Sequence, residues 1–141
     1  MKSSLDFANL KVEEYTTPSP FSIRDNAPIP KVLQTMQDKE VRHLPVTNSG
    51  GDTIGIISDR DLSAVKSFAF KADLKAKDIM TPDPVSVNVN SGLLEAAYEM
   101  SRRKIGSLIV NDNEGQVYGI FTNTDALNAL VEILRGDVEG E

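Results

Sequence analysis

The chain has 141 residues, of which 40% are hydrophobic, so it is long enough to bury the core of one compact domain. Its formal net charge of −6 argues against nucleic-acid binding, because such proteins need a basic surface to replace counterions. The sequence has no cysteine, which excludes disulfides and thiolate metal sites, and no run of about 18 apolar residues predicts a membrane span. Residues 1–14 do not resemble a secretory signal, so we expect a cytoplasmic location.

An internal repeat is the clearest feature of the sequence. The pattern T-P-x-P-apolar-S-apolar begins at Thr17 and recurs at Thr81, 64 residues later. The same spacing, without a gap, relates further pairs: Asn26 and Asn90, Met36 and Met100, Gly55 and Gly119, Asp61 and Asp125. A register kept over this length indicates a tandem duplication.

Each repeat begins with the T-P-x-P segment, which predicts a short edge strand because an edge position tolerates proline. Asn26 and Asn90 follow as candidate N-caps of a helix. Behind them, apolar residues recur at i, i+3, i+4 and i+7, which predicts a helix with one apolar face.

A hairpin and a second helix complete each repeat. Two strands joined by a polar, glycine-containing turn are predicted at 41–46 with 53–57 and at 105–110 with 117–121. Ser58 and Thr122 then begin the closing helices, and Gly136 ends the second one. The last helix carries its apolar residues on one side: Ala126, Leu127, Leu130, Val131 and Leu134.

These elements predict an α+β fold made of two β-α-β-β-α units. One unit of about sixty residues would bury too little surface alone, so we expect the two, related by a pseudo-two-fold axis, to share one core. The expected first unit is 1–66 with an N-terminal lead-in, and the second is 78–135. Residues 67–77 are expected to link them, and 136–141 to form a flexible tail.

The corner between the last strand and the closing helix carries the chemistry, in the pattern G-x-x-[S/T]-x-x-D. Ser58 and Thr122 lie at a helix start, where free backbone N–H groups favour a phosphate. Asp61 and Asp125, three residues later, can accept two hydrogen bonds from a ribose diol. The same spacing also describes a capping box, which needs no ligand, and both interpretations can hold together.

Two motifs connect the chain to a known family. They are V-R-H-L-P-V at 41–46 and G-I-I-S-D-R-D at 55–61, the latter repeated as G-I-F-T-N-T-D at 119–125. In this order, after T-P-x-P strands, they resemble the tandem cystathionine-β-synthase (CBS) domain pair, or Bateman module, over residues 12–134. The resemblance implies a disc-like homodimer that packs through its helices; Phe68, Phe70 and Tyr98 are apolar positions consistent with it.

The resemblance also implies an adenine slot between the first strand and the paired strands. In the first repeat this falls on Thr17, Phe21, Ile23, Leu44, Pro45 and Val46. In the second repeat it falls on Thr81, Val85, Val87, Leu108, Ile109 and Val110. Taken singly, each of the apolar residues also fits an ordinary core position.

His43 is the only histidine, so a metal site is not expected. With Arg42 or Arg60 it is a candidate contact for a phosphate, the alternative being a partly exposed strand residue. The corresponding residues of the second repeat carry no charge: Gly106, Ser107 and Thr124. The first site is therefore better suited to a polyphosphate and the second to a less charged ligand.

The sequence favours a stand-alone regulatory module that binds an adenine nucleotide of the AMP, ADP or ATP type and signals, through conformation or association, to a separate effector protein. The alternatives are a ligand-free structural or dimerisation module and a sensor of NAD or S-adenosylmethionine. An enzyme is not expected, because no base, nucleophile and orienting acid form a set and no G-x-x-x-x-G-K-[S/T] loop is present. No cofactor is required.

Overall fold

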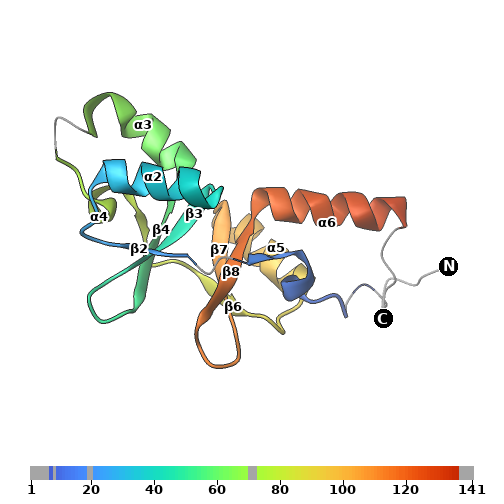
Figure 1. Cartoon of the computed structure of the whole chain (residues 1–141). Helices are drawn as coiled ribbons and strands as arrows, with labels where there is room; N and C mark the ends of the chain where they lie inside the picture. Colours follow the sequence, from blue (N-terminus) through green and yellow to red (C-terminus); the bar gives the residue numbers. More distant parts are fainter. Residues whose placement is uncertain (1–6, 8, 19–20, 70–72, 137–141) are drawn as a thin grey trace. The chain divides into compact units, whose positions relative to one another are not determined.

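The computed structural model describes residues 7, 9–18, 21–69 and 73–136 (Figure 1). The backbone divides into two compact units. Phe21–Pro84 form the first-repeat unit, and Met1–Pro20 with Val85–Glu141 form the second-repeat unit. Each unit is described by itself below.

The first-repeat unit is a four-stranded mixed sheet with helices. Its elements are β2 (Ile23–Arg24), α2 (Ile29–Lys39), β3 (His43–Thr47), β4 (Thr53–Ser58), α3 (Asp59–Ala69), α4 (Ala76–Ile79) and β5 (Thr81–Pro82). The strand order is β2-β3-β4-β5, in which β2 runs parallel to β3 and the other neighbours are antiparallel. The predicted hairpin is therefore confirmed as β3 and β4.

The second-repeat unit has the same plan. Its elements are η1 (Val12–Tyr15), β1 (Thr17–Pro18), β6 (Ser86–Asn88), α5 (Leu93–Arg103), β7 (Ser107–Asn111), β8 (Val117–Thr122) and α6 (Asn123–Arg135). The strand order is β1-β8-β7-β6, with β6 parallel to β7. The α+β class and the repeated β-α-β-β-α order are confirmed.

The T-P strands are exchanged between the repeats, which corrects the predicted first strand. Thr17–Pro18 pair with Gly119 and Ile120 of the second repeat, whereas Thr81–Pro82 pair with β4 of the first. The edge position is as predicted, but T-P and the apolar residues after it belong to different sheets. Proline lacks the N–H that a ladder needs, and Asp83 at φ 51° lies in the left-handed region, so β5 ends after two residues.

Each unit has a hydrophobic cluster between its helices and one face of its sheet. In the first-repeat unit, α2 and α3 contribute residues such as Val32 and Leu62, which pack with Leu44 of β3. In the second-repeat unit the equivalent cluster centres on Phe121, which is fully buried. Leu10 and Val12, from the start of the chain, complete that second cluster.

The first helices begin later than the asparagines suggested. The N-cap of α2 is Pro28 and that of α5 is Gly92, neither with a capping side chain, so the predicted caps Asn26 and Asn90 are wrong. The Nδ2 of Asn90 instead donates to Asn113 Oδ1 at 3.0 Å, in the loop of the β7–β8 hairpin. Asparagine favours turns as much as helix starts, and here the turn prevails.

The closing helices begin at the predicted corners. Thr122 is the N-cap of α6, and Gly136 at φ 76° is its left-handed C-cap, as predicted. The predicted apolar side of α6, however, is not its buried side: Asp125 and Ala129 are buried, whereas four of the five apolar residues named above are exposed. Phe70 and the predicted tail 137–141 lie outside the described residues, as does the side chain of Phe68.

Candidate functional site

The predicted binding residues of the first repeat share one sheet face. Pro45 and Ile56 are paired across β3 and β4, and their strand neighbours belong to the helix-facing cluster. Because side chains alternate along a strand, this pair points to the opposite face. His43 and Ser58, paired two residues further on, and Thr81, paired with Ile56, lie on that same face. We call it the second sheet face.

The second sheet face of the second-repeat unit is built in the same way. Thr17 pairs with Ile120, which in turn pairs with Ile109 of β7. Thr122 lies two residues beyond Ile120 and so points to the same side. The predicted site residues Thr17, Ile109 and Thr122 are thus gathered on one surface of one sheet.

This arrangement corrects the grouping of the two threonines. Thr17 was expected with Pro45, and Thr81 with Ile109, but the exchanged strands place them the other way round. Pro45 and Ile109 are both buried, at most 2% exposed. The remaining apolar strand residues of the implied slot belong to the helix-facing clusters: Ile23, Leu44 and Val46 in the first-repeat unit, and Val87, Leu108 and Val110 in the second-repeat unit.

The first corner is a capping box. Ser58 N–H donates to Asp61 Oδ2 at 3.0 Å, and Asp61 N–H donates to Ser58 Oγ at 3.1 Å. The N–H groups of Ser58 and Asp61 at the start of α3 are therefore satisfied within the chain. Among the described residues, no further donor reaches the Asp61 carboxylate, and its side chain is partly exposed.

The second corner is more heavily bonded. Thr122 donates to Asp125 Oδ2 from its N–H at 2.9 Å and from its hydroxyl at 3.1 Å, and Asp125 N–H donates back to Thr122 Oγ1. In addition, the Thr17 hydroxyl donates to Asp125 Oδ1 at 3.1 Å. Asp125 is only 9% exposed. The structure thus joins three predicted site residues, Thr17, Thr122 and Asp125, in one hydrogen-bonded cluster.

The cationic candidates surround the first corner only. Arg60 lies in the first turn of α3 and is exposed, and Arg42 is exposed immediately before β3. His43 is half-buried and opposite Ser58. Their counterparts in the second repeat are uncharged, so the two corners differ in charge as well as in hydrogen bonding.

The glycines of the motif make room for the exchanged strands. A Cβ on Gly119 would overlap the carbonyl oxygen of Thr17 and lie 3.0 Å from Pro18 Cα. A Cβ on Gly55 would lie 2.9 Å from the carbonyl oxygen of Thr81 and overlap the Met80 side chain. The pattern indicated close approach of a ligand or a neighbouring backbone, and the neighbour found is the T-P backbone.

Sequence reasoning missed a further repeated element next to the site. Short helices η1 and α4 precede the two T-P strands, and each has a box in which a lysine N–H bonds an acid three residues later. Lys11 N–H donates to Glu14 Oε2 at 3.2 Å, and Lys75 N–H donates to Asp78 Oδ2 at 2.8 Å. These pairs also obey the 64-residue spacing, which is the signal that could have revealed them.

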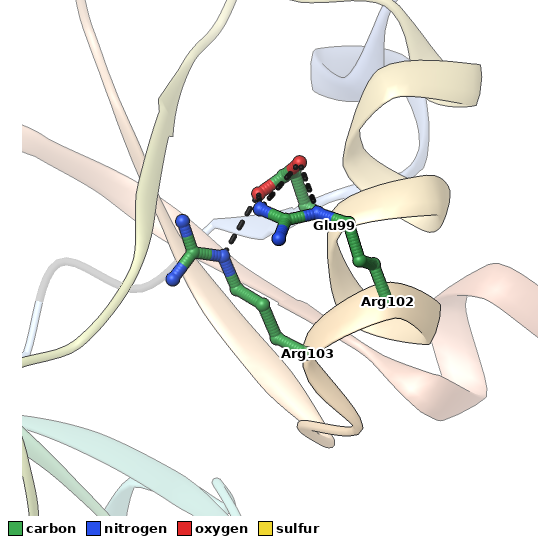
Figure 2. A network of polar contacts seen from close by, with 3 residues as sticks. All are labelled: Glu99, Arg102 and Arg103. Carbon is green, nitrogen blue, oxygen red and sulfur yellow. Dashed lines mark hydrogen bonds and ion pairs between the residues drawn. The ribbon is translucent and has the colours of Figure 1, made fainter.

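The basic run at the end of α5 is internally paired (Figure 2). Arg102 donates three hydrogen bonds to Glu99 and Arg103 a fourth, with shortest distances of 2.8 Å for each arginine. The hydrogen bonds from Arg102 and then Arg103 hold the pKa of Glu99 below its usual range, and Glu99 raises the pKa of Arg102. The run is therefore a surface ion-pair network on the helix.

We expect Glu99→Gln to lower the melting temperature slightly at neutral pH. The pKa of Glu99 is lowered by folding, so its contribution is present above the unfolded value of about 4.3 and is lost as pH falls through the folded value. The melting temperatures of the two proteins should therefore converge as the pH falls below about 4.3, and also in high salt. An equal effect of Glu99→Gln in a protein that already lacks both arginine charges would contradict this explanation.

Two negative findings bound the chemistry of the described residues. No group of three or more His, Cys, Asp or Glu side chains there could hold a metal ion. Within the same residues, no helix has both the length and the apolarity needed to cross a bilayer.

Comparisons with known proteins agree with the fold. A CBS domain-containing protein of Dictyostelium discoideum is 28% identical over 135 residues, which cover 88% of this chain and 93% of the relative. A homoserine O-acetyltransferase of Methanococcoides burtonii is 32% identical over 120 residues, which cover 85% of this chain but only 24% of the enzyme. The chain therefore spans about a quarter of the length of such relatives.

Among solved structures, CBSX2 in complex with AMP aligns with a TM-score of 0.69 and 27% identity, covering 89% of this chain and 99% of that one. CBSX2 is a CBS-pair protein from Arabidopsis thaliana. The CBS domain family profile matches residues 12–67 and 76–132, nearly the whole of both repeats. The chain therefore belongs to the CBS domain family and carries two CBS domains in tandem.

Proposed function

We propose that the chain is a regulatory module that binds an adenine nucleotide of the AMP, ADP or ATP type and passes the signal to a separate effector protein. The observation that carries the proposal is the cluster of Thr17, Thr122 and Asp125, with its partial counterpart at Ser58 and Asp61. CBSX2, a related protein whose crystallised chain is covered to 99%, has been crystallised with AMP, which supports the ligand class.

Each corner suits a nucleotide because a hydroxyl group, the start of a helix and a carboxylate lie close together there. A phosphate would be held by the hydroxyl of Ser58 or Thr122 and by those N–H groups of the helix start that the capping box does not use. The ribose diol would bond the carboxylate of Asp61 or Asp125. Thr17 and Thr81, and the buried Pro45 and Ile109, would border the adenine on the second sheet face.

The two corners should prefer different ligands. Arg60 and His43 lie beside Ser58, so the first corner is suited to a polyphosphate such as ATP. The second corner has no such cations, and Thr17 already occupies one carboxylate oxygen of Asp125. We expect it to bind a less charged ligand such as AMP.

The proposal includes no catalysis and no required cofactor. Relatives that are enzymes are several times longer than this chain, and the matched region is a minor part of each. A cytoplasmic location and a homodimer, expected from the sequence and from the resemblance, belong to the same proposal. A ligand-free dimerisation module and a sensor of NAD or S-adenosylmethionine are the competing functions.

Thermal unfolding with each candidate ligand separates these functions. At about 100 times its dissociation constant, a true ligand stabilises the folded protein by about 2.7 kcal/mol. We expect that gain with AMP or ATP, and its loss in Asp61→Ala, Asp125→Ala double variants. Asp59→Ala, which removes an exposed carboxylate of the same helix, is the matched control.

The single variants test the difference between the corners. Asp61→Ala should remove mainly the response to ATP, and Asp125→Ala mainly the response to AMP. Equal preference at both surviving corners would contradict the assignment. Absence of any response in the unmodified protein would leave the dimerisation module as the better function, and a response to NAD or S-adenosylmethionine alone would change the ligand class.

A further inference from the structure

The two corners differ in how many hydrogen bonds their carboxylates already accept. Among the described residues, the N–H and the hydroxyl of Thr122 donate to Asp125 Oδ2, and the hydroxyl of Thr17 donates to Asp125 Oδ1. Asp61 accepts only the N–H of Ser58, at Oδ2. Because an ionised carboxylate has about four positions for donors, about one remains on Asp125 and about three remain on Asp61.

The Thr17 hydroxyl takes the position that a ribose hydroxyl would take at Asp125. It donates to Asp125 Oδ1 at 3.1 Å, and Thr17 lies on the second sheet face, where the adenine is expected. A ribose 2′,3′-diol that bonds a carboxylate with both hydroxyls needs a free acceptor position for each of them. While Thr17 keeps its hydrogen bond, Asp125 can therefore accept only one ribose hydroxyl.

Strand β1 holds Thr17 in this position. The hydroxyl of the preceding residue, Thr16, is part of a residue only 6% exposed and donates to the carbonyl oxygen of Val12 at 2.7 Å. Thr17 itself pairs with Ile120 of β8. Gly119 lies so close that a Cβ there would overlap the carbonyl oxygen of Thr17. These contacts fix the backbone at Thr17, so a ligand at the second corner meets the hydroxyl in place.

The first repeat lacks this hydrogen bond, although it has the same residue types. At the 64-residue spacing, Thr81 and Asp61 are the counterparts of the bonded pair. Thr81 lies on the second sheet face of its own unit, but no hydrogen bond joins it to Asp61 among the described residues. The residue before it is Met80, which has no hydroxyl to anchor the strand as Thr16 does. The free positions of Asp61 are therefore open to both hydroxyls of a ribose.

We infer that Thr17 sets the ribose specificity of the second corner, so that this corner recognises a single ribose hydroxyl whereas the first corner recognises both. The second corner accordingly takes adenine nucleotides whose ribose carries only one free hydroxyl, such as 2′-deoxy-AMP or 3′-deoxy-AMP, as readily as AMP. The inference rests on the proposed function, in which Asp61 and Asp125 hold the ribose, and adds which part of the sugar each acid recognises. Thr17 acts here by occupying an acceptor position of Asp125.

Calorimetric titration of the full chain measures the ribose specificity of each corner. Asp61→Ala leaves the second corner, where at least one of 2′-deoxy-AMP and 3′-deoxy-AMP should bind within about threefold of AMP, because one hydroxyl is enough. Asp125→Ala leaves the first corner, which is tested with ATP and its two deoxy forms. There both deoxy nucleotides should bind about tenfold or more weakly than ATP, because each loses a hydrogen bond to a charged group.

Two substitutions at Thr17, each made in the Asp61→Ala protein, isolate the effect of its hydroxyl. Thr17→Val removes the donor, so both deoxy forms of AMP should then bind about tenfold or more weakly than AMP. Thr17→Ser keeps the donor and should keep the specificity seen with threonine. The readout is the ratio of the affinities for AMP and its deoxy forms, because an altered contact with the adenine changes both affinities alike. This comparison carries the test alone if circular dichroism shows that Asp125→Ala does not fold.

Three results would overturn the inference and leave the proposed function in place. The first is a loss of about tenfold or more for both deoxy forms of AMP in Asp61→Ala with Thr17 present. The second is an affinity ratio that Thr17→Val does not change. The third is a second corner that binds no adenine nucleotide with either residue at position 17, while the first corner does. Absence of nucleotide binding in the unmodified protein and in every variant would instead overturn the proposed function itself.

Discussion

Gly119→Ala is expected to lower the free energy of unfolding by about 2–3 kcal/mol, at the upper end of what overpacking costs. The added Cβ would overlap the carbonyl oxygen of Thr17 and crowd Pro18, both backbone atoms of a strand that cannot rotate away. Strand β1 would have to leave β8, and with it would go the hydrogen bond from Thr17 to Asp125. Urea unfolding followed by circular dichroism measures the change.

Alanine substitutions at two other glycines provide comparisons for Gly119→Ala. Gly92→Ala places its Cβ no closer than 3.9 Å to any neighbour, so it adds no overlap. Its expected cost is the ~0.5–1 kcal/mol of replacing glycine by alanine at a helix N-cap. Gly55→Ala is expected to lie between the two, because much of its overlap is with the flexible side chain of Met80. Similar losses in the free energy of unfolding for Gly119→Ala and Gly92→Ala would show that β1 is free to shift. The close approach of β1 would then not explain the glycine of the G-x-x-[S/T]-x-x-D motif.

The repeat allowed most of the fold to be predicted from the sequence. Each hairpin, closing helix and corner could be read twice at the same spacing, so a weak local pattern in one copy was supported by the other. The helix starts were less predictable, because Asn26 and Asn90 satisfy the preferences of a turn as well as those of an N-cap. Only the structure shows that helices begin after Pro28 and Gly92.

The exchange of the T-P strands could not be predicted in the same way. Both repeats carry the same T-P-x-P pattern. The local sequence therefore cannot tell whether Thr17 pairs with a strand of its own repeat or with a strand of the other repeat. The choice depends on long-range contacts, such as the packing of Leu10 and Val12 in the second cluster. The predicted grouping of the threonines was therefore wrong: Thr17 belongs to the sheet of the second repeat and Thr81 to that of the first.

The burial of the last helix shows a similar limit. Periodicity on α6 predicted an apolar side, and that side exists, yet residues such as Leu127 and Leu134 are exposed. An apolar side on a helix predicts a packing contact, but it does not show whether that contact is with the chain's own core. Asp125, which the sequence predicts as a ligand contact, is among the buried residues of the helix.

Asp125→Ala is expected to destabilise the protein by about 2–3 kcal/mol, and Asp61→Ala by about 1 kcal/mol. The Asp125 carboxylate accepts three hydrogen bonds at a buried position, from the N–H and hydroxyl of Thr122 and from the hydroxyl of Thr17. Its removal leaves those donors partly unsatisfied, which costs more than the loss of an exposed cap. Among the described residues, Asp61 accepts only the Ser58 N–H, at a more exposed corner.

A double-mutant cycle isolates the bond that distinguishes the two corners. Thr17→Val keeps the shape of the side chain but removes its donor, so its cost should be about 1 kcal/mol and should largely disappear when Asp125 is already alanine. Thr81→Val with Asp61→Ala is the matched cycle in the first repeat, where no such bond is found among the described residues, and should show no coupling. Because a ribose would compete with Thr17 for Asp125 Oδ1, Thr17→Val should also change nucleotide affinity at the second corner. Coupling of equal size in both cycles would mean that the corners are equivalent, and the asymmetry drawn from Asp125 would then be wrong.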